Sequence, residues 1–141
     1  MKRIIIAVLC ALGLVSALDA QEKKGVMTLS SKEFKTKVYD IAAKNPEYLG
    51  SKPAIVDFYA SWCGPCRAIS PVLEELAKEY GDKIVIYKVD VDASRDIAQA
   101  FGIRSIPAVL FIPMKGEAQM TVGGRSKEDV KKQIDTILLC K

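Results

Sequence analysis

Two cysteines three residues apart, Cys63 and Cys66, are the side chains of this sequence best suited to carry out a reaction. They lie between a continuous apolar run, residues 54–59, and a segment whose apolar residues recur at helical spacing. A cysteine in the first turn of a helix lies near unpaired backbone N–H groups and the positive end of the helix dipole, which both stabilise the thiolate. A second cysteine three residues later lies on the same helix face, within reach of a disulfide. The pair predicts redox chemistry, in which the Cys63 thiolate attacks a disulfide and Cys66, the less exposed thiol, resolves the product.

Two other uses of the cysteine pair have to be weighed against redox chemistry. A structural disulfide across three residues removes little entropy from the unfolded chain and therefore stabilises weakly. A structural zinc site needs four ligands, and the chain has no histidine. Because Cys10 lies in the N-terminal segment that is expected to be cleaved, only Cys140 and carboxylates remain to complete one. Redox chemistry is the favoured interpretation, and we expect no metal site and no other cofactor.

A single carboxylate interrupts the apolar run that precedes the cysteines. Asp57 stands in the middle of residues 54–59, before Cys63. Burial raises the pKa of a carboxyl group toward neutrality, which suits general acid–base work, so Asp57 is a candidate proton acceptor for Cys66, directly or through water. Lys88, in a neighbouring predicted strand, is a candidate partner for Asp57. The alternatives are that Asp57 faces solvent from an edge strand and that Lys88 is an ordinary surface lysine.

Composition excludes several other functions. The chain has 141 residues, half of them hydrophobic and about a quarter charged, which is typical of one small globular domain and not of a disordered or low-complexity chain. The absence of histidine excludes Ser-His and Cys-His catalytic pairs. The formal net charge of +4 is spread along the chain without a basic block, so nucleic-acid binding is not expected.

The N-terminal segment has the pattern of an export signal. Two basic residues follow Met1, an apolar run extends over residues 4–18, and small residues precede polar sequence. A run of this length is in the signal-peptide range and shorter than the roughly 20 residues of a membrane-spanning helix. We expect a cleaved signal peptide at residues 1–20 and one domain at residues 21–141. Export would place this domain in the periplasm or an equivalent compartment, where disulfides persist.

The elements that position the candidate residues alternate between strands and helices. Strands are expected at 26–29, 54–59, 84–89, 108–112 and 117–122, and helices at about 30–43, from the cysteine pair to 80 with Pro71 inside, at about 94–101 and from 126 onward. Such alternation implies crossovers and parallel pairing, with an antiparallel hairpin at the end. The continuous apolar run at 54–59 indicates a central strand. The predicted fold class is α/β, a mixed central β-sheet with helices on both faces.

The segment 56–66, from Val56 to Cys66, resembles the active-site segment of thioredoxin. Four further residues fall where that family has a kink proline, a buried lysine, a cis-proline and a substrate-facing glycine, namely Pro71, Lys88, Pro107 and Gly123. The similarity covers roughly residues 26–139. It implies a thioredoxin fold and thiol–disulfide exchange with protein substrates, with Cys63–Cys66 as the redox-active disulfide.

The resemblance also implies roles for individual residues. Asp57 would take up the proton that Cys66 releases, and Lys88 would tune the pKa of Asp57. The Ile106–Pro107 bond would be cis, which spacing alone does not predict. A groove that aligns a substrate strand beside the cysteines would be formed by Trp62, Gly64, Pro65, Ser105, Ile106, Pro107 and Gly123. From the residues alone, simple core packing is the alternative for Trp62.

The residues between the cysteines predict the direction of exchange. A histidine there would stabilise the Cys63 thiolate and make the protein an oxidant, whereas Gly64 and Pro65 carry no charge. We expect a monomeric reductase of exported proteins, recharged by a membrane thiol transporter, because the leader separates it from cytosolic reductase. The alternatives are a disulfide oxidase or isomerase in the same compartment, and a binding module whose redox activity is incidental. Cys140 is expected to be an idle thiol, and the alternatives are pairing with another molecule and a regulatory thiol.

Overall fold

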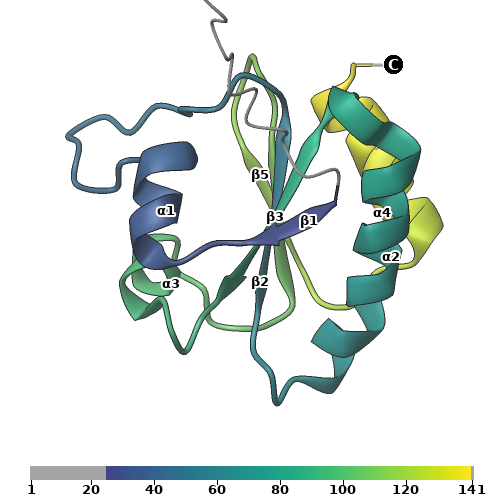
Figure 1. Cartoon of the computed structure of the whole chain (residues 1–141), viewed down its shortest axis with the longest axis horizontal. Helices are drawn as coiled ribbons and strands as arrows, with labels where there is room; N and C mark the ends of the chain where they lie inside the picture. Colours follow the sequence, from purple (N-terminus) through teal and green to yellow (C-terminus); the bar gives the residue numbers. More distant parts are fainter. Residues whose placement is uncertain (1–24, 141) are drawn as a thin grey trace, which may run out of the picture.

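Five strands form one mixed sheet in the order β1-β3-β2-β4-β5. In the computed structural model, which describes residues 25–140, the strands are β1 (Val26–Thr28), β2 (Ala54–Tyr59), β3 (Val85–Asp90), β4 (Ala108–Ile112) and β5 (Gln119–Val122). Strands β1 and β2 run parallel to β3, whereas β4 is antiparallel to both β2 and β5 (Figure 1). The sheet confirms the predicted fold class, and β2 lies at its centre, as its continuous apolar sequence predicted.

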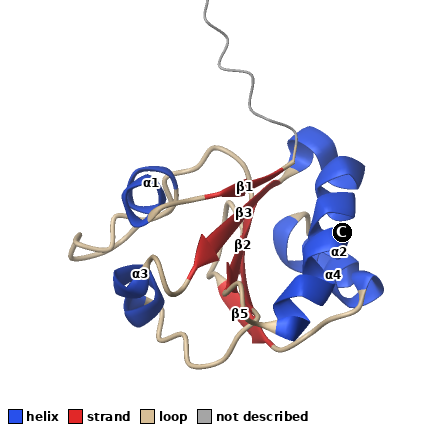
Figure 2. Ribbon diagram, turned by 60° about the horizontal axis from the view of Figure 1, so that its bottom comes forward, coloured by secondary structure: helices blue, strands red, loops and turns tan. Residues whose placement is uncertain are grey.

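Helices cover both faces of this sheet, as Figure 2 shows. On one face lie α1 (Ser31–Lys37) and α3 (Arg95–Ala100). On the other face lie α2 (Gly64–Tyr80) and α4 (Lys127–Gln133), which continues into the π-helical turn η2 (Ile134–Leu138). A short 3₁₀ turn, η1 (Gly81–Lys83), follows α2. The long α2 helix continues through Pro71.

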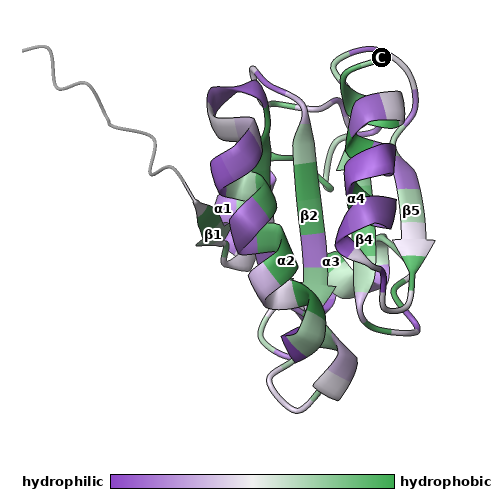
Figure 3. Ribbon diagram, turned by 90° about the vertical axis from the view of Figure 1, so that its right-hand side faces the viewer, coloured by the Kyte–Doolittle hydropathy of each residue, from purple (hydrophilic) through white to green (hydrophobic). Residues whose placement is uncertain are grey.

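The alternation of side chains along each strand builds two separate hydrophobic cores. Ile55 of β2 packs under α2 and α4, whereas the next residue, Val56, packs under α1 and α3. Since successive side chains of a strand point to opposite faces, a strand covered on both sides has to be apolar throughout. Figure 3 shows β2 as a mostly hydrophobic strand between α2 and α4, interrupted by a hydrophilic band. Asp57 is the charged residue of this strand and is fully buried.

Helix α1 is shorter than the sequence predicts. Ser30 and Glu33 have the spacing of a capping box and form one at the start of the helix, but the helix ends at Lys37 and not near residue 43. After the helix, Asp40 accepts a hydrogen bond from the backbone N–H of Ala42, a local bond that competes with helix continuation. Three apolar residues recur at helical spacing in this segment, Phe34, Val38 and Ile41. Phe34 and Val38 are in the core, whereas Ile41, which lies after the helix, is only half-buried.

The connection through α3 also differs from the prediction, because β4 returns antiparallel to β2. Helix α3 has six residues and advances about 9 Å, whereas the six residues of β3 span about 20 Å. The helix therefore does not carry the chain back to the start of β3. Ala108, the first residue of β4, pairs instead with Phe58 near the end of β2. As a consequence, the ends of β2, β3 and β5 and the start of β4 lie at one edge of the sheet.

The signal peptide predicted at residues 1–20 lies outside the described residues, and so does the start of the predicted domain at 21–24. Within residues 25–140, no helix has the length and apolar character needed to cross a membrane.

Candidate functional site

Cys63 and Cys66 lie at the edge where these strand ends meet, in the loop from β2 into α2, and are joined by a disulfide. Cys63 is the N-cap residue of α2, and its Sγ accepts a hydrogen bond of 3.2 Å from the backbone N–H of Cys66. Their Cα atoms are 5.3 Å apart, within the usual range for a disulfide. Both side chains are nearly buried, with 4% of Cys63 and 2% of Cys66 exposed, while Gly64 and Pro65 between them are exposed.

This arrangement lets the first turn of α2 act on one sulfur. The N-cap position places the Cys63 sulfur beside backbone N–H groups that have no partner within the helix. These groups and the positive end of the helix dipole would favour a thiolate at Cys63 once the disulfide is reduced. Cys66 lies one turn further into the helix and has the smaller exposed fraction.

Asp57 lies in β2, two residues before the strand ends, and its side chain is fully buried. Neither carboxylate oxygen has a hydrogen-bond partner among the described residues. Burial raises the pKa of Asp57 from 3.8 to about 6, against a smaller opposing effect of the Lys88 charge. The alternative that Asp57 faces solvent from an edge strand is wrong, because β2 is the central strand.

Lys88 is the cross-strand neighbour of Asp57 in the β2–β3 register. Its side chain is half-buried, with Nζ lying 4.3 Å from the centroid of the Tyr59 ring and donating a hydrogen bond to Ser70 Oγ. No ion pair between Lys88 and Asp57 is formed in the part of the chain that the structure describes. Lys88 is therefore not an ordinary surface lysine, and its ammonium contacts α2 instead of the carboxylate.

The loop before β4 lies beside the disulfide and carries the cis Ile106–Pro107 bond implied by the resemblance. Ile106 packs against the cluster that contains Cys63 and Cys66. The backbone N–H of Gly123 donates a hydrogen bond of 2.8 Å to the carbonyl oxygen of Pro107, which joins the end of β5 to this loop.

Trp62 is a surface residue, so the core-packing alternative is wrong. Its side chain is 68% exposed, and its indole Nε1 donates a hydrogen bond of 2.8 Å to Asp92 Oδ2. A hollow of about 130 Å³ opens beside this ring. It is lined by Trp62, Val91, Ile103, Arg104, Ser105 and Ile106. Exposed apolar surface beside a disulfide is suited to contact with an extended protein segment.

The structure thus gathers the predicted site residues at one edge of the sheet, from four different strand ends. Reasoning from the sequence missed two of their neighbours, Asp92 and Ser70. Asp92 lies two residues after β3, and its place in the loop that follows a predicted strand was the available signal. Ser70 lies four residues after Cys66, on the same face of α2, and that spacing was the available signal.

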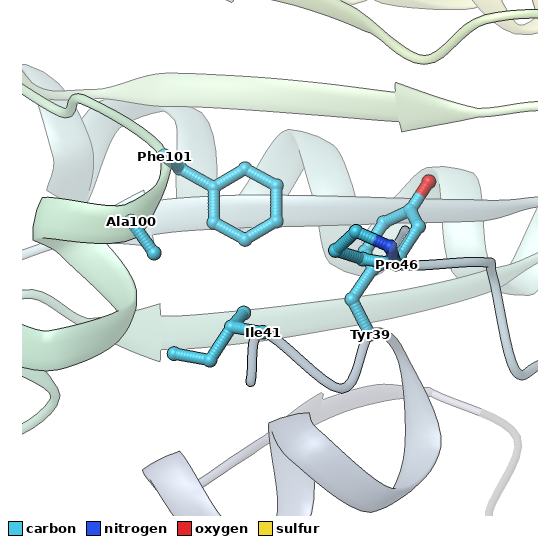
Figure 4. A pocket seen from close by; sticks show the side chains of 5 residues that line it. All are labelled: Tyr39, Ile41, Pro46, Ala100 and Phe101. Atoms are coloured by element: carbon cyan, nitrogen blue, oxygen red, sulfur yellow. The ribbon is translucent and has the colours of Figure 1, made fainter. Parts of the chain in front are cut away.

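Two other features lie away from the disulfide. A larger hollow of about 310 Å³ opens between the segment after α1 and the end of α3, and Figure 4 shows its lining of Tyr39, Ile41, Pro46, Ala100 and Phe101. Cys140 is exposed and is not part of a disulfide. No group of three or more Cys, Asp or Glu side chains within residues 25–140 is arranged to hold a metal ion.

Comparison with known proteins identifies the family. The family model Thioredoxin matches residues 25–136. The chain is 45% identical to a thioredoxin of Borreliella burgdorferi over 98 residues, which are 69% of this chain and 84% of that protein. It is 40% identical to a thioredoxin of Chlorobaculum thiosulfatiphilum over 106 residues, 75% of this chain and 90% of that protein. A chloroplastic M-type thioredoxin of Pisum sativum is 44% identical over 88 residues, 62% of this chain and about half (51%) of that longer protein.

A solved structure gives the same assignment. The crystal structure of chloroplastic thioredoxin z superposes with a TM-score of 0.67 at 27% identity, covering 80% of this chain and 94% of that one. The matched region contains the whole sheet and the Cys63–Cys66 pair. The chain belongs to the thioredoxin family, and its Cys63–Cys66 pair makes it a thiol–disulfide oxidoreductase.

Proposed function

We propose that this oxidoreductase is a monomeric, exported reductase of protein disulfides. The observation that carries the reducing direction is the environment of the Cys63 sulfur. Cys63 Sγ accepts a hydrogen bond from a backbone N–H, that of Cys66, and the two residues between the cysteines, Gly64 and Pro65, offer neither a charge nor a side-chain donor. A thiolate with few stabilising groups lowers the stability of the reduced form and favours its oxidation, so the pair passes electrons to the substrate.

The chemistry proceeds in two exchanges. The Cys63 thiolate attacks one sulfur of a substrate disulfide, and the other substrate sulfur leaves as a thiolate, which takes a proton from water. Asp57 then accepts the proton of Cys66, and the resulting thiolate attacks Cys63 Sγ. The second substrate sulfur leaves as a thiolate and takes a proton from water, and Asp57 returns the proton of Cys66 to the solvent. The substrate has gained two electrons and two protons, and the enzyme holds the Cys63–Cys66 disulfide.

The substrate is held by the surface beside the disulfide. The loop of Ile106 and Pro107 presents backbone groups to an extended substrate strand, together with Ser105 and Gly123. Exposed Trp62, with Gly64 and Pro65, forms the opposite side of this groove. Backbone pairing of this kind suits many protein sequences, because it depends little on substrate side chains.

Measuring the reduction potential of the Cys63–Cys66 pair tests the direction. The purified protein is equilibrated with dithiothreitol or glutathione at graded ratios, and Trp62, the single tryptophan of the chain, reports the change by fluorescence. A potential near the roughly −270 mV of thioredoxin supports a reductase. A potential at or above the roughly −180 mV of disulfide isomerase overturns the reductase and supports disulfide formation or shuffling.

Substituting the cysteines tests whether catalysis is the function at all. Cys66→Ser should trap a mixed disulfide between Cys63 and a substrate protein, because the resolving thiol is gone. Cys63→Ser should trap nothing. If the biological effect survives loss of both thiols, the protein is a binding module and the enzymatic proposal fails.

Export and the electron donor are parts of the same proposal and need their own test. Support comes from the positive start and apolar run of residues 1–20. Fused to a reporter that is active only after export, the full chain should give activity, and a chain that lacks residues 1–20 should give none. Equal activity of both fusions would overturn the export. An exported reductant needs electrons from a membrane thiol transporter, so the pair should be oxidised in cells that lack such a transporter.

A further inference from the structure

The ammonium group of Lys88 is held by two neighbours that are not acidic. Nζ donates a hydrogen bond to Ser70 Oγ, and it lies 4.3 Å from the centroid of the Tyr59 ring, where a cation is attracted by the ring face. Ser70 reaches this position because it lies one helical turn beyond Cys66, on the face of α2 that covers the sheet. Tyr59 reaches it from the end of β2.

The carboxylate that would normally pair with this ammonium lies on the neighbouring strand and accepts no hydrogen bond from the described residues. Asp57 is the cross-strand neighbour of Lys88, and both of its carboxylate oxygens lack a hydrogen-bond partner among the described residues. A buried carboxylate beside a lysine gains from direct pairing, because the pair offsets the cost of desolvation. The hydrogen bond to Ser70 competes with that pairing.

We propose that Ser70 is a positioning residue of the reaction, because its hydroxyl oxygen holds the Lys88 ammonium and keeps it from pairing with the Asp57 carboxylate. The inference rests on the role of Asp57 as proton acceptor given under the proposed function. An unpaired carboxylate is the stronger base, so it accepts the proton of Cys66 more readily than one bound to a lysine.

Of the residues around Asp57, Lys88 is the one whose charge changes the basicity of the carboxylate. Strand β3 contributes Lys88 and, two residues further along the strand, Asp90. Helix α2 contributes Cys66 and the uncharged Ser70, with the exposed Arg67 at its first turn, and β2 itself contributes Tyr59. Strand β4 places Val109, which does not titrate, opposite Asp57. Lys88 is the charge that lowers the pKa of Asp57, so a shift of its ammonium changes the basicity of the carboxylate.

The experiment follows the Asp57 carboxyl directly by ¹³C NMR across pH 4 to 9 in the oxidised protein, with and without the Ser70 hydroxyl. Ser70→Ala should lower the titration midpoint of Asp57 by about one pH unit, because the released ammonium pairs with the carboxylate. The acid limb of the pH profile for disulfide reduction should move by the same amount. Ser70→Thr, which keeps the hydroxyl, should titrate like the wild type. Alanine favours helix more than serine does, so α2 is expected to stay intact.

Two further variants make the outcome decisive. Thr136→Ala removes a hydroxyl from η2, where it binds the carbonyl oxygen of Lys132, and should leave the Asp57 midpoint unchanged. In a Lys88→Met background, Ser70→Ala should have no effect on the midpoint.

An unchanged or raised midpoint in Ser70→Ala alone overturns the role of Ser70 and leaves the reductase proposal standing. If Asp57→Asn keeps the wild-type pH profile, the proton role of Asp57 is wrong and this inference fails with it.

Discussion

The indole Nε1 of Trp62 donates a hydrogen bond of 2.8 Å to Asp92 Oδ2, which joins the loop before α2 to the loop after β3. The two residues are 30 positions apart in the chain, and both side chains lie at the surface. The bond fixes the orientation of a large apolar ring that is 68% exposed beside the disulfide. A ring held in place before binding loses less entropy when a substrate contacts it.

Replacing Asp92 by alanine should weaken substrate binding. Loss of a hydrogen bond to a charged group releases the Trp62 ring, and a loss of about 1 kcal/mol corresponds to a roughly fivefold rise in KM for a protein disulfide. Fluorescence anisotropy of Trp62, the single tryptophan, should fall. The control is Asp82→Ala in η1, at the other end of α2. Unchanged anisotropy and KM in Asp92→Ala would show that the hydrogen bond does not hold the ring.

Replacing Gly123 by alanine should destabilise the protein through the backbone. Gly123 has φ of +93°, and no atom lies within 4 Å of where its Cβ would be, so the penalty is conformational strain and not a clash. We expect a loss of about 1–2 kcal/mol in the free energy of unfolding, measured by urea denaturation. Gly124→Ala is the matched control, because Gly124 also has open space and lacks a positive φ. Equal stability of both variants would contradict the prediction.

Removing the cap of α1 should also destabilise the protein, by a different mechanism. The Ser30 hydroxyl accepts a hydrogen bond from the backbone N–H of Glu33, whose carboxylate accepts one in return from the Ser30 backbone. Ser30→Ala should lower the free energy of unfolding by about 1 kcal/mol, as measured in urea. Glu33→Gln retains an acceptor and should lose less. A larger loss in Glu33→Gln than in Ser30→Ala would show that the carboxylate charge, and not the cap, stabilises this helix.

The sequence was sufficient to predict features that depend on local pattern. The capping box of α1, the central position of β2 and the disulfide at the start of α2 follow from residue type and spacing over short stretches. The burial of Asp57 follows as well, because a strand that is apolar on both faces has helices on both faces.

Features that depend on residues distant in the chain were not predicted. The contacts of Trp62 with Asp92 and of Lys88 with Ser70 join residues 30 and 18 positions apart, and they form only once the strand ends meet at one edge. The early end of α1 was missed for a local reason instead, because a hydrogen bond at Asp40 competes with an apolar pattern at helical spacing that continues to Ile41. The antiparallel entry of β4 depends on the short length of α3, which periodicity alone leaves undefined.

The buried carboxylate of Asp57 should make the protein less stable as pH rises from about 4 to about 6. In the unfolded chain its pKa is near 3.8, and in the folded protein burial raises the pKa to about 6. Between these values the folded protein holds a proton that the unfolded chain releases, so the free energy of unfolding falls with rising pH. Above pH 6 both states are ionised, and a shift of about two pH units corresponds to a constant penalty of about 3 kcal/mol.

Asp57→Asn should remove that slope, because an amide does not titrate, and should therefore exceed the wild type in stability at pH 7 by up to about 3 kcal/mol. Urea denaturation at half-unit steps from pH 3 to pH 8 measures both quantities. Asp96→Asn is the control, because the pKa of Asp96 is shifted in the opposite direction: hydrogen bonds from Lys35 and Ser31 lower it to about 2. The stability that ionised Asp96 contributes is therefore present above pH 3.8 and is lost as pH falls toward 2. It should leave the slope between pH 4 and pH 6 intact. If Asp57→Asn keeps the wild-type slope, burial does not raise the pKa of Asp57, and this carboxylate is not poised near neutrality to take the proton of Cys66.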